Sequence, residues 1–152
     1  GRLRASTVRY LIEQSIPVCG HLGLLPQSIH QLGGYKLQGQ DERSAERLLE
    51  DASLLEAAGA SLLVLECIPA TLAAEISAQL SIPTIGIGAG PDCDGQVLVL
   101  HDMLGLNPKM PRFCRDFLQD SGSITAAVTA YVAAVRNGRF PDTAHSYALH
   151  PL

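Results

Sequence analysis

The order of apolar and polar positions along the chain predicts helices that alternate with short strands. Apolar residues recur at helical spacing in some segments and form short unbroken runs in others. The predicted helices cover residues 3–14, 42–58, 70–80 and 123–137, and the predicted strands cover residues 16–20, 61–67 and 82–87. Strands and helices that alternate in this way are typical of α/β proteins with a parallel sheet. We therefore expect an α/β fold.

The helix and strand between residues 42 and 67 have the clearest pattern. One side of the helix at 42–58 is apolar, and it comprises Ala45, Leu48, Leu49, Ala52, Leu54 and Leu55. Gly59 follows as the glycine that commonly ends a helix. The strand at 61–67 is apolar at almost every position, as expected of a strand covered on both faces. The glycine-rich residues 21–39 are expected to form a long loop.

The segment at 96–104 fits two assignments. Residues 96–100 form an apolar run typical of a strand, but only about eight residues separate this run from the preceding strand, whereas a parallel crossover usually takes about a dozen. Asp94 as N-cap and Gly105 as C-terminal glycine would equally frame one helix over 95–104. We expect a short strand that runs into a helical turn.

Composition restricts the class of protein. The 152 residues are 47% hydrophobic and 17% charged, with a formal net charge of −4. This apolar content excludes intrinsic disorder, and we assign residues 1–152 to a single domain. The mild acidity argues against a nucleic acid or an anionic membrane as partner. No unbroken apolar stretch approaches the ~18 residues of a membrane span.

The cysteines and the start of the chain suggest its setting. Cys19, Cys67, Cys93 and Cys114 contain no C-x-x-C pair, which argues against a disulfide framework or a zinc site. The first residues lack the apolar region of a signal peptide, and the chain begins with Gly1 rather than Met. We expect a cytoplasmic protein and a chain that is part of a longer one.

The most informative polar residue is Glu66, near the end of the apolar strand. Strand alternation places its side chain on the same face as Leu62 and Val64. A carboxylate in an apolar environment is costly unless it is partnered, and catalytic groups of parallel α/β proteins collect at the carboxyl ends of strands. Glu66 is therefore a candidate general base. The alternative is a structural carboxylate paired with an arginine or a backbone N–H.

His21 occupies the equivalent position after the first predicted strand. Alone, it would be interpreted at least as well as a hydrogen-bonded loop residue. The carboxyl ends of neighbouring parallel strands lie at one edge of a sheet, so we expect His21 and Glu66 to be close. This pairing makes a catalytic role for His21 as plausible as a structural one.

Two further groups give weaker signals. The glycines at 86–90 lack the G-x-G-x-x-G or Walker spacing of phosphate-binding loops, and close backbone packing explains them equally well. Asp92, Asp94 and Asp102 could hold a metal ion, but the first two lie in a Gly/Pro turn, where aspartate is common. We assign no metal ligand from this spacing.

Six motifs follow one another along the chain. They are V-C-G-H-L-G-L-L-P-Q-S at 18–28, G-G-Y-K-L-Q-G at 33–39, L-V-L-E-C-I-P at 63–69, I-G-I-G-A-G at 85–90, D-G-Q-V-L-V-L-H-D at 94–102 and a closing F-P…H-S-Y at 140–147. Together they resemble the C-terminal part of the ketopantoate hydroxymethyltransferase (3-methyl-2-oxobutanoate hydroxymethyltransferase) family. The resemblance extends over essentially the whole chain.

This resemblance implies a (βα)8 TIM barrel, of which the chain supplies the second half with about four parallel strands. It implies transfer of a hydroxymethyl group from 5,10-methylenetetrahydrofolate to the 2-oxo acid 3-methyl-2-oxobutanoate, giving 2-dehydropantoate in pantothenate and coenzyme A biosynthesis. The family uses Mg²⁺, which would stabilise the enolate of the 2-oxo acid. Glu66 matches the family's proton-acceptor glutamate, and His21 matches a histidine at the barrel mouth. The complete enzyme is expected to be a homo-oligomer.

Part of the family pattern falls outside the chain. In the family, two aspartates and a glutamate from earlier strands hold the metal, and an upstream serine and lysine hold the substrate carboxylate. The chain begins after the fourth strand, so we expect none of its residues to be a Mg²⁺ ligand. Half a barrel exposes two sheet edges and an apolar inner face. We expect the isolated chain to be inactive and to dimerise, aggregate or remain partly molten.

Two other functions stay open on the sequence. One is a non-catalytic half-barrel fragment. The other is an enolising barrel enzyme of the phosphoenolpyruvate/pyruvate type, which would share the glutamate at the strand end. The motifs around His21 and Tyr35 favour the hydroxymethyltransferase family over the second of these. Only an activity measurement separates the family's enzyme from an inert fragment.

Overall fold

The computed structural model describes residues 1–148 and contains a parallel sheet of four strands. The strands are β1 (Cys19–Gly23), β2 (Leu62–Glu66), β3 (Thr84–Ile87) and β4 (Gly95–Gln96), and they lie side by side in this order. The helices are α1 (Ala5–Glu13), α2 (Ile29–Leu32), α3 (Glu42–Ala57), α4 (Ala70–Gln79), α5 (Leu100–Met103) and α6 (Ile124–Arg136). Short 3₁₀ turns at Arg2–Arg4 and Pro26–Ser28 precede α1 and α2. The predicted α/β fold is confirmed.

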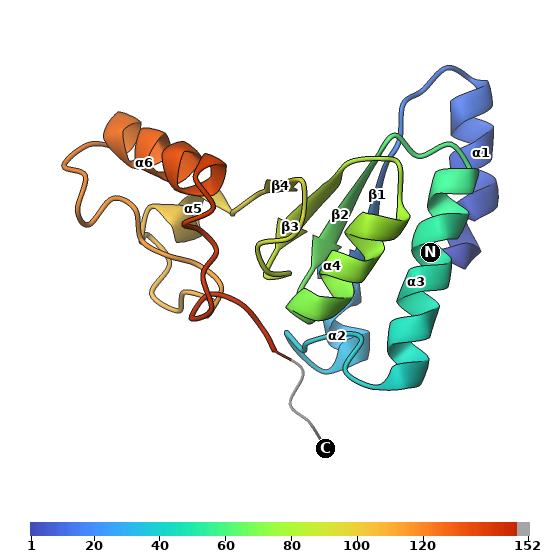
Figure 1. Ribbon diagram of the computed structural model, residues 1–152, viewed down its shortest axis with the longest axis horizontal. Coiled ribbons are helices and arrows are strands. Elements are labelled where there is room, and N and C mark those ends of the chain that lie inside the picture. The colour runs from blue at the N-terminus through green and yellow to red at the C-terminus, as the bar shows by residue number, and fades with distance from the viewer. Residues whose placement is uncertain (149–152) are drawn as a thin grey trace.

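Helices α1, α3 and α4 lie along one face of this sheet (Figure 1). Leu63 and Leu65 of β2 point toward them and are fully buried, whereas Val64 and Glu66 on the opposite face are only partly buried. Burial of each such leucine stabilises the fold by roughly 1.5–3 kcal/mol. The core beneath the helices also includes Val8, Leu22, Ala52, Leu55, Leu72, Ala73 and Ile76.

Helix α3 confirms the helix predicted at 42–58. Asp41 caps its N-terminus, since Oδ1 accepts a hydrogen bond from Ser44 N at 3.0 Å and Asp41 N donates to Ser44 Oγ at 3.3 Å. Such caps typically contribute about 1 kcal/mol. Gly59 follows with a φ of 101°, as expected of the glycine that ends a helix. The predicted apolar side is buried or half-buried except at Leu54, which is 42% exposed.

The segment at 95–104 consists of a two-residue strand followed by a helical turn. β4 pairs with β3 in parallel, and after it Val97 N donates to Gly86 O at 3.0 Å before α5 begins. The predicted order of a strand and a helical turn is confirmed, but the strand covers only Gly95–Gln96 rather than residues 96–100, and the alternative of one helix is wrong. A crossover helix is unnecessary because β4 begins opposite Ile85, so residues 88–94 make only a short return.

Asp94 fixes the turn between β3 and β4. Its Oδ2 accepts hydrogen bonds from Thr84 N at 2.7 Å and from Thr84 Oγ1 at 3.0 Å. Thr84 is fully buried, and its hydroxyl also lies 2.7 Å from Ser77 Oγ of α4. The hydrogen bond from the Thr84 backbone, reinforced by its hydroxyl, lowers the pKa of Asp94. Asp94 is therefore a structural residue of this turn.

The chain beyond β4 builds a second apolar cluster, away from α1 and α3 (Figure 1). Its buried members are Met103, Leu104, Phe117, Ala127, Ala134 and Phe140. The ring of Phe140 meets those of Phe117 and Tyr131 edge-on, with 5.4 and 5.9 Å between centroids. Helix α6 begins after Ser123, whose Oγ accepts a backbone hydrogen bond at 3.2 Å, and it confirms the helix predicted at 123–137.

The first strand lies further along the chain than predicted. β1 covers Cys19–Gly23 rather than residues 16–20, because its pairing with β2 begins opposite Leu62 and Ile16 is 48% exposed. His21 therefore lies within the strand and not after it.

The other predicted elements of the sheet layer agree with the structure to within a few residues. They are the helices at 3–14 and 70–80 and the strands at 61–67 and 82–87. The long loop predicted at 21–39 is wrong in part, because it contains the end of β1 and the short helix α2.

Four parallel strands in sequential order, with helices on their outer face, form the arrangement of part of a (βα)8 barrel. The fold class implied by the resemblance is confirmed. Within residues 1–148, the outer edges of β1 and β4 have no strand beside them. No helix in that range is both long and apolar enough to cross a membrane.

Replacing Asp94 by alanine should lower the free energy of unfolding by about 1–3 kcal/mol, because the buried Thr84 N–H would lose its acceptor. Urea unfolding at a fixed protein concentration measures this loss. Folding lowers the pKa of Asp94 below the ordinary carboxylate pKa of about 4. At a pH above that ordinary pKa the ionised carboxylate stabilises the fold in full. The stabilisation is lost as the pH falls through the lowered pKa and the carboxylate becomes protonated. The difference between wild type and Asp94→Ala should therefore shrink in acid.

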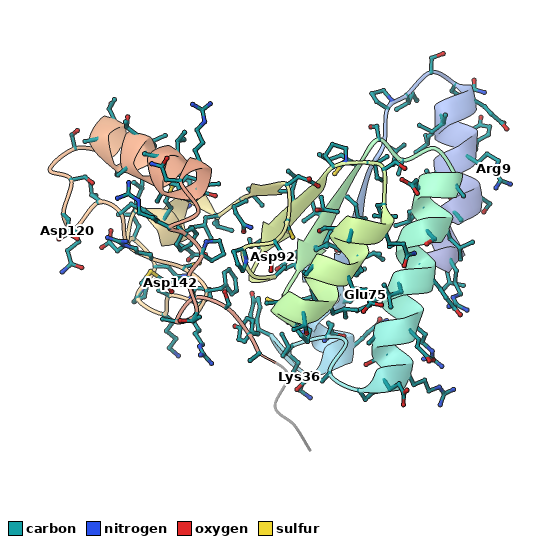
Figure 2. All side chains as sticks on the ribbon, viewed as in Figure 1. Arg9, Lys36, Glu75, Asp92, Asp120 and Asp142 are labelled. Carbon is teal, nitrogen blue, oxygen red and sulfur yellow. The ribbon has the colours of Figure 1, made fainter. Side chains whose placement is uncertain are left out.

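The matched control is Asp92→Ala, in the same turn (Figure 2), because Asp92 is also exposed but, among residues 1–148, its carboxylate accepts no hydrogen bond, unlike that of Asp94. Equal losses of stability in the two variants, or a loss for Asp94→Ala that does not change in acid, would show that Asp94 does not hold this turn.

The 152-residue chain should self-associate in solution, because two strand edges and the half-buried face around Val64 and Ile85 can pair with or pack against other chains. Size-exclusion chromatography with light scattering measures the mass of the particle. A monodisperse species of 16.1 kDa that unfolds in one sharp transition would contradict this prediction.

Candidate active site

The side chain of Glu66 lies at the carboxyl end of β2, on the face of the sheet opposite the helices. β2 alternates between the two faces, so Glu66 shares its face with Leu62 and Val64, while Leu63 and Leu65 face the helices. The Glu66 side chain is only 14% exposed. The predicted orientation of Glu66 is confirmed.

The end of β1 holds the backbone of Glu66 in place. Glu66 O accepts a hydrogen bond from Leu24 N at 2.8 Å. Gly23 has a φ of 87°, and a β-carbon at this position would overlap with Glu66 O. Glycine alone fits here, because any side chain would push the end of β2 away. The glycine of the H-L-G motif therefore fixes the position of the candidate base.

His21 approaches Glu66 from the neighbouring strand. Its Cα pairs with that of Val64 in the parallel register, two residues before Glu66 and on the same face. The Nε2 atom lies 3.0 Å from Glu66 Oε2. Nε2 is buried, and its N–H is not aligned with an acceptor among residues 1–148. A small rotation of either side chain would align the pair, as commonly occurs when a ligand binds.

A cleft of about 1050 Å³ includes Glu66 at the carboxyl end of the sheet. Its walls come from segments that follow the strands, namely Tyr35 and Leu37 after β1, Ile87 at the end of β3 and residues 99–113 after β4. Most of the lining side chains are apolar, with a few polar groups among them. This composition is typical of clefts that bind small organic ligands.

The C-terminal segment returns from α6 toward the end of the sheet beside α4 (Figure 1). Tyr147 O accepts a hydrogen bond from Ala70 N, at the start of α4, at 2.9 Å. The Tyr147 ring lines the cleft and meets Phe113 edge-on, with 6.4 Å between centroids, and the Arg112 guanidinium lies 5.8 Å from the ring centroid. Burial raises the pKa of Tyr147. The closing H-S-Y motif thereby supplies one wall of the cleft.

Asp142, labelled in Figure 2, holds the turn that leads into this wall. Its Oδ1 accepts hydrogen bonds from Ala144 N at 2.9 Å and His145 N at 3.1 Å, and lies 2.7 Å from His145 Nδ1. The side-chain hydrogen bond with His145 lowers the pKa of Asp142. The Asp142–His145 pair therefore has a structural role in this turn.

Two cysteines lie beside the site. Cys67 and Cys114 belong to an apolar cluster with Leu24, Ile87 and Phe113. Burial raises the pKa of each of the two thiols to about 12, so both stay protonated at neutral pH. All four cysteines of the chain are free thiols.

The described residues do not fit a complete Mg²⁺ site. Among residues 1–148, no three His, Cys, Asp or Glu side chains are placed to share a metal ion. Mg²⁺ requires several oxygen ligands, whereas the close neighbour of Glu66 is the imidazole of His21. Asp92 and Asp94 belong to the β3–β4 turn, so the structure does not gather the aspartates weighed from the sequence.

The glycines at 86–90 pack closely against other elements. Gly90 has a φ of 79°, and a β-carbon there would overlap with Ala70 of α4. A β-carbon on Gly88 would meet the ring of Phe113. These close approaches support the packing interpretation of the run.

His101, Asp102 and Lys109 line the cleft but are not predicted site residues. His101 and Asp102 lie in α5 and Lys109 in the loop beyond it, on the carboxyl side of β4, whereas Glu66 is the last residue of β2. The sequence predicts the strand and the helical turn of this segment, but it does not show that the segment lines the same cleft as Glu66.

Known proteins resemble the chain along most of its length. The family model for ketopantoate hydroxymethyltransferase matches residues 1–143. The 3-methyl-2-oxobutanoate hydroxymethyltransferase of Burkholderia multivorans is 58% identical over 148 residues, which are 97% of this chain and 55% of that protein. The protein of the same name from Methylococcus capsulatus is 60% identical over 147 residues, again 97% of this chain and 55% of the relative.

The enzyme of that name from Xanthomonas axonopodis pv. citri is 58% identical over 147 residues, covering 95% of this chain and 54% of the relative. The chain thus spans about half the length of the curated relatives that it matches. The match nevertheless includes both predicted site residues, His21 and Glu66, and the segments that line the cleft up to residue 143. The chain therefore belongs to the ketopantoate hydroxymethyltransferase family.

Proposed function

We propose that the protein to which this chain belongs transfers a hydroxymethyl group from 5,10-methylenetetrahydrofolate to 3-methyl-2-oxobutanoate, and that Glu66 is the base. The relatives carry the name of this enzyme. The observation that carries the proposal is the position of Glu66, a carboxylate 14% exposed at the carboxyl end of a parallel strand, in a cleft of about 1050 Å³.

The chemistry requires a base at this position. The proton on C3 of 3-methyl-2-oxobutanoate is adjacent to the ketone, so its removal leaves an enolate. Glu66 takes this proton as the C3–H bond breaks. The C3 carbon then forms a bond to the methylene carbon of 5,10-methylenetetrahydrofolate, both C–N bonds of that carbon break, and water supplies the hydroxyl oxygen. The C3 proton and the two hydrogens of water end on the new hydroxyl and on N5 and N10 of the folate, so the products are 2-dehydropantoate and tetrahydrofolate. A partly buried carboxylate suits this step because few water molecules compete for it.

His21 supports the carboxylate in this proposal. With 3.0 Å between Nε2 and Glu66 Oε2, the imidazole can donate a hydrogen bond that orients Glu66 toward the substrate. The contact of Glu66 O with Leu24 N restrains the backbone of the same residue. The backbone of Glu66 is therefore held by β1, and alignment of His21 Nε2 with Oε2 would orient the carboxylate as well, as efficient proton transfer requires.

In this proposal, the complete protein binds Mg²⁺, recognises the carboxylate of the substrate and forms the oligomer. The described residues do not hold three candidate metal ligands, so we propose that the Mg²⁺ ligands lie in the half of the relatives that this chain does not span. The proposal includes a cytoplasmic homo-oligomer that acts on a small 2-oxo acid and a reduced folate, with no nucleic acid or membrane partner.

Glu66→Gln should reduce the rate of 2-dehydropantoate formation by about 10²–10⁴-fold, because the amide cannot accept the C3 proton. The rate is measured in an enzyme assembled from this chain and the remaining half of a relative. The control is Glu75→Gln, which changes an exposed glutamate on α4 (Figure 2) and should leave the rate unchanged. Turnover of Glu66→Gln at the wild-type rate would remove Glu66 from the proposed role.

His21→Ala should lower kcat about tenfold with little change in KM, because the substrate still binds while the carboxylate loses one hydrogen bond. Steady-state kinetics in the same assembled enzyme separates the two constants. His30→Ala on α2 is the control, since His30 is exposed and does not line the cleft. A rise in KM alone would instead assign His21 to substrate binding.

A further inference from the structure

The cleft that contains Glu66 is larger than the proposed acceptor requires. Its volume of about 1050 Å³ lies at the upper end of the range of about 300–1,000 Å³ that encloses drug-sized ligands. 3-Methyl-2-oxobutanoate is a small branched acid that would fill only a fraction of this space. The part of the cleft lined by residues 99–113 is therefore available to a second ligand beside Glu66.

We propose that residues 99–113 form the subsite for the one-carbon donor, with Asp102 binding the N–H edge of its aminopyrimidine ring and Lys109 binding its anionic tail. This inference rests on the proposed function, because that reaction requires a donor next to the acceptor. It adds to the proposed function a location and two recognition residues.

Asp102 has the properties of a ligand-binding carboxylate. It lines the cleft but is only 6% exposed, at the start of the wall that follows β4. Its Oδ1 accepts one hydrogen bond, from Asn107 Nδ2 at 2.9 Å, and among residues 1–148 no other donor reaches the carboxylate. A carboxylate has about four acceptor positions, and among residues 1–148 no donor occupies those of Asp102 Oδ2, so acceptor positions remain on a side chain that lines the cleft. A ligand with adjacent N–H groups would satisfy those that remain.

The surroundings of Asp102 suit a flat ring. Leu106, Pro108, Pro111, Phe113 and Tyr147 contribute apolar surface to the same cleft, and the Phe113 and Tyr147 rings already hold each other edge-on. Stacking and apolar contact on these side chains would hold an aromatic ring without specifying its orientation. The paired hydrogen bonds to Asp102 would then set that orientation.

Lys109 supplies the opposite charge at the outer part of this wall. Its side chain is exposed and lines the cleft, and within residues 1–148 it forms no ion pair. Reduced folates carry a glutamate tail with two carboxylates. A ring held at the buried Asp102 would leave this tail near the exposed ammonium group.

The test measures binding by equilibrium dialysis to the enzyme assembled from this chain and the remaining half of a relative, with 5-formyltetrahydrofolate as a stable folate and 6-methyltetrahydropterin as the same ring without the tail. Asp102→Asn should weaken the binding of both ligands by about tenfold to a hundredfold, because hydrogen bonds to a charged group are lost. Lys109→Gln should weaken only the folate, by about two- to fivefold, because this ion pair is exposed.

Asp120→Asn is the matched control, since Asp120 is exposed in the loop before α6 and does not line the cleft (Figure 2). It should bind both ligands as the wild type does. Far-UV circular dichroism checks the fold of each variant. If Asp102→Asn fails to fold, the comparison of the two ligands on Lys109→Gln still tests the subsite.

Three results would overturn the inference. The first is the absence of saturable binding of the pterin to the assembled wild-type enzyme, and the second is equal affinity of wild type and Asp102→Asn. The third is tighter binding of guanosine 5′-monophosphate, which presents the same N–H edge on a purine and would identify a nucleotide site.

Failure of the proposed function would give a different pattern. Exchange of the C3 proton of 3-methyl-2-oxobutanoate depends on Glu66 and needs no donor. If the assembled enzyme binds the pterin but does not exchange the C3 proton, the proposed reaction is contradicted while the proposed donor subsite is supported. Exchange without pterin binding would refute the donor subsite alone.

Discussion

The parallel pairing of β1 with β2 is the constraint on which the site depends. This register places His21 opposite Val64 and brings its Nε2 to 3.0 Å from Glu66 Oε2. At the end of the same pair, Leu24 N donates to Glu66 O, and the glycine at position 23 permits the close approach. A shift by one residue would turn every side chain to the opposite face. The two groups would then no longer meet.

The remaining walls of the cleft follow from the same geometry. Parallel strands end at one edge, so the segments after β1, β2, β3 and β4 all collect there. The cluster around Phe117 and Phe140 anchors the segment after β4, and the hydrogen bond from Ala70 N to Tyr147 O anchors the C-terminal one. The cleft therefore combines a candidate base on a rigid strand with walls from several loops, as is typical of barrel enzymes.

Much of this could be predicted from the sequence, because long elements leave strong patterns. The apolar run ending in Glu66 identifies both the strand and its facing, and the helix at 42–58 is evident from its spacing. The sequence is less informative where tertiary pairing decides the structure. β1 begins at Cys19 because β2 is available there, and β4 contains only two residues. Asp102, weighed from the sequence only as a possible metal ligand, lines the same cleft as Glu66 because of the tertiary fold, which the local pattern does not contain.

The central claim is that Glu66 removes the C3 proton of 3-methyl-2-oxobutanoate. Its most direct test is proton exchange in D₂O followed by NMR, with Mg²⁺ present and the folate omitted, in an enzyme assembled from this chain and the remaining half of a relative. The claim requires exchange at C3 that stops when Glu66 is replaced by glutamine. Exchange that continues at the same rate in that variant would contradict it, because another group would then be the base.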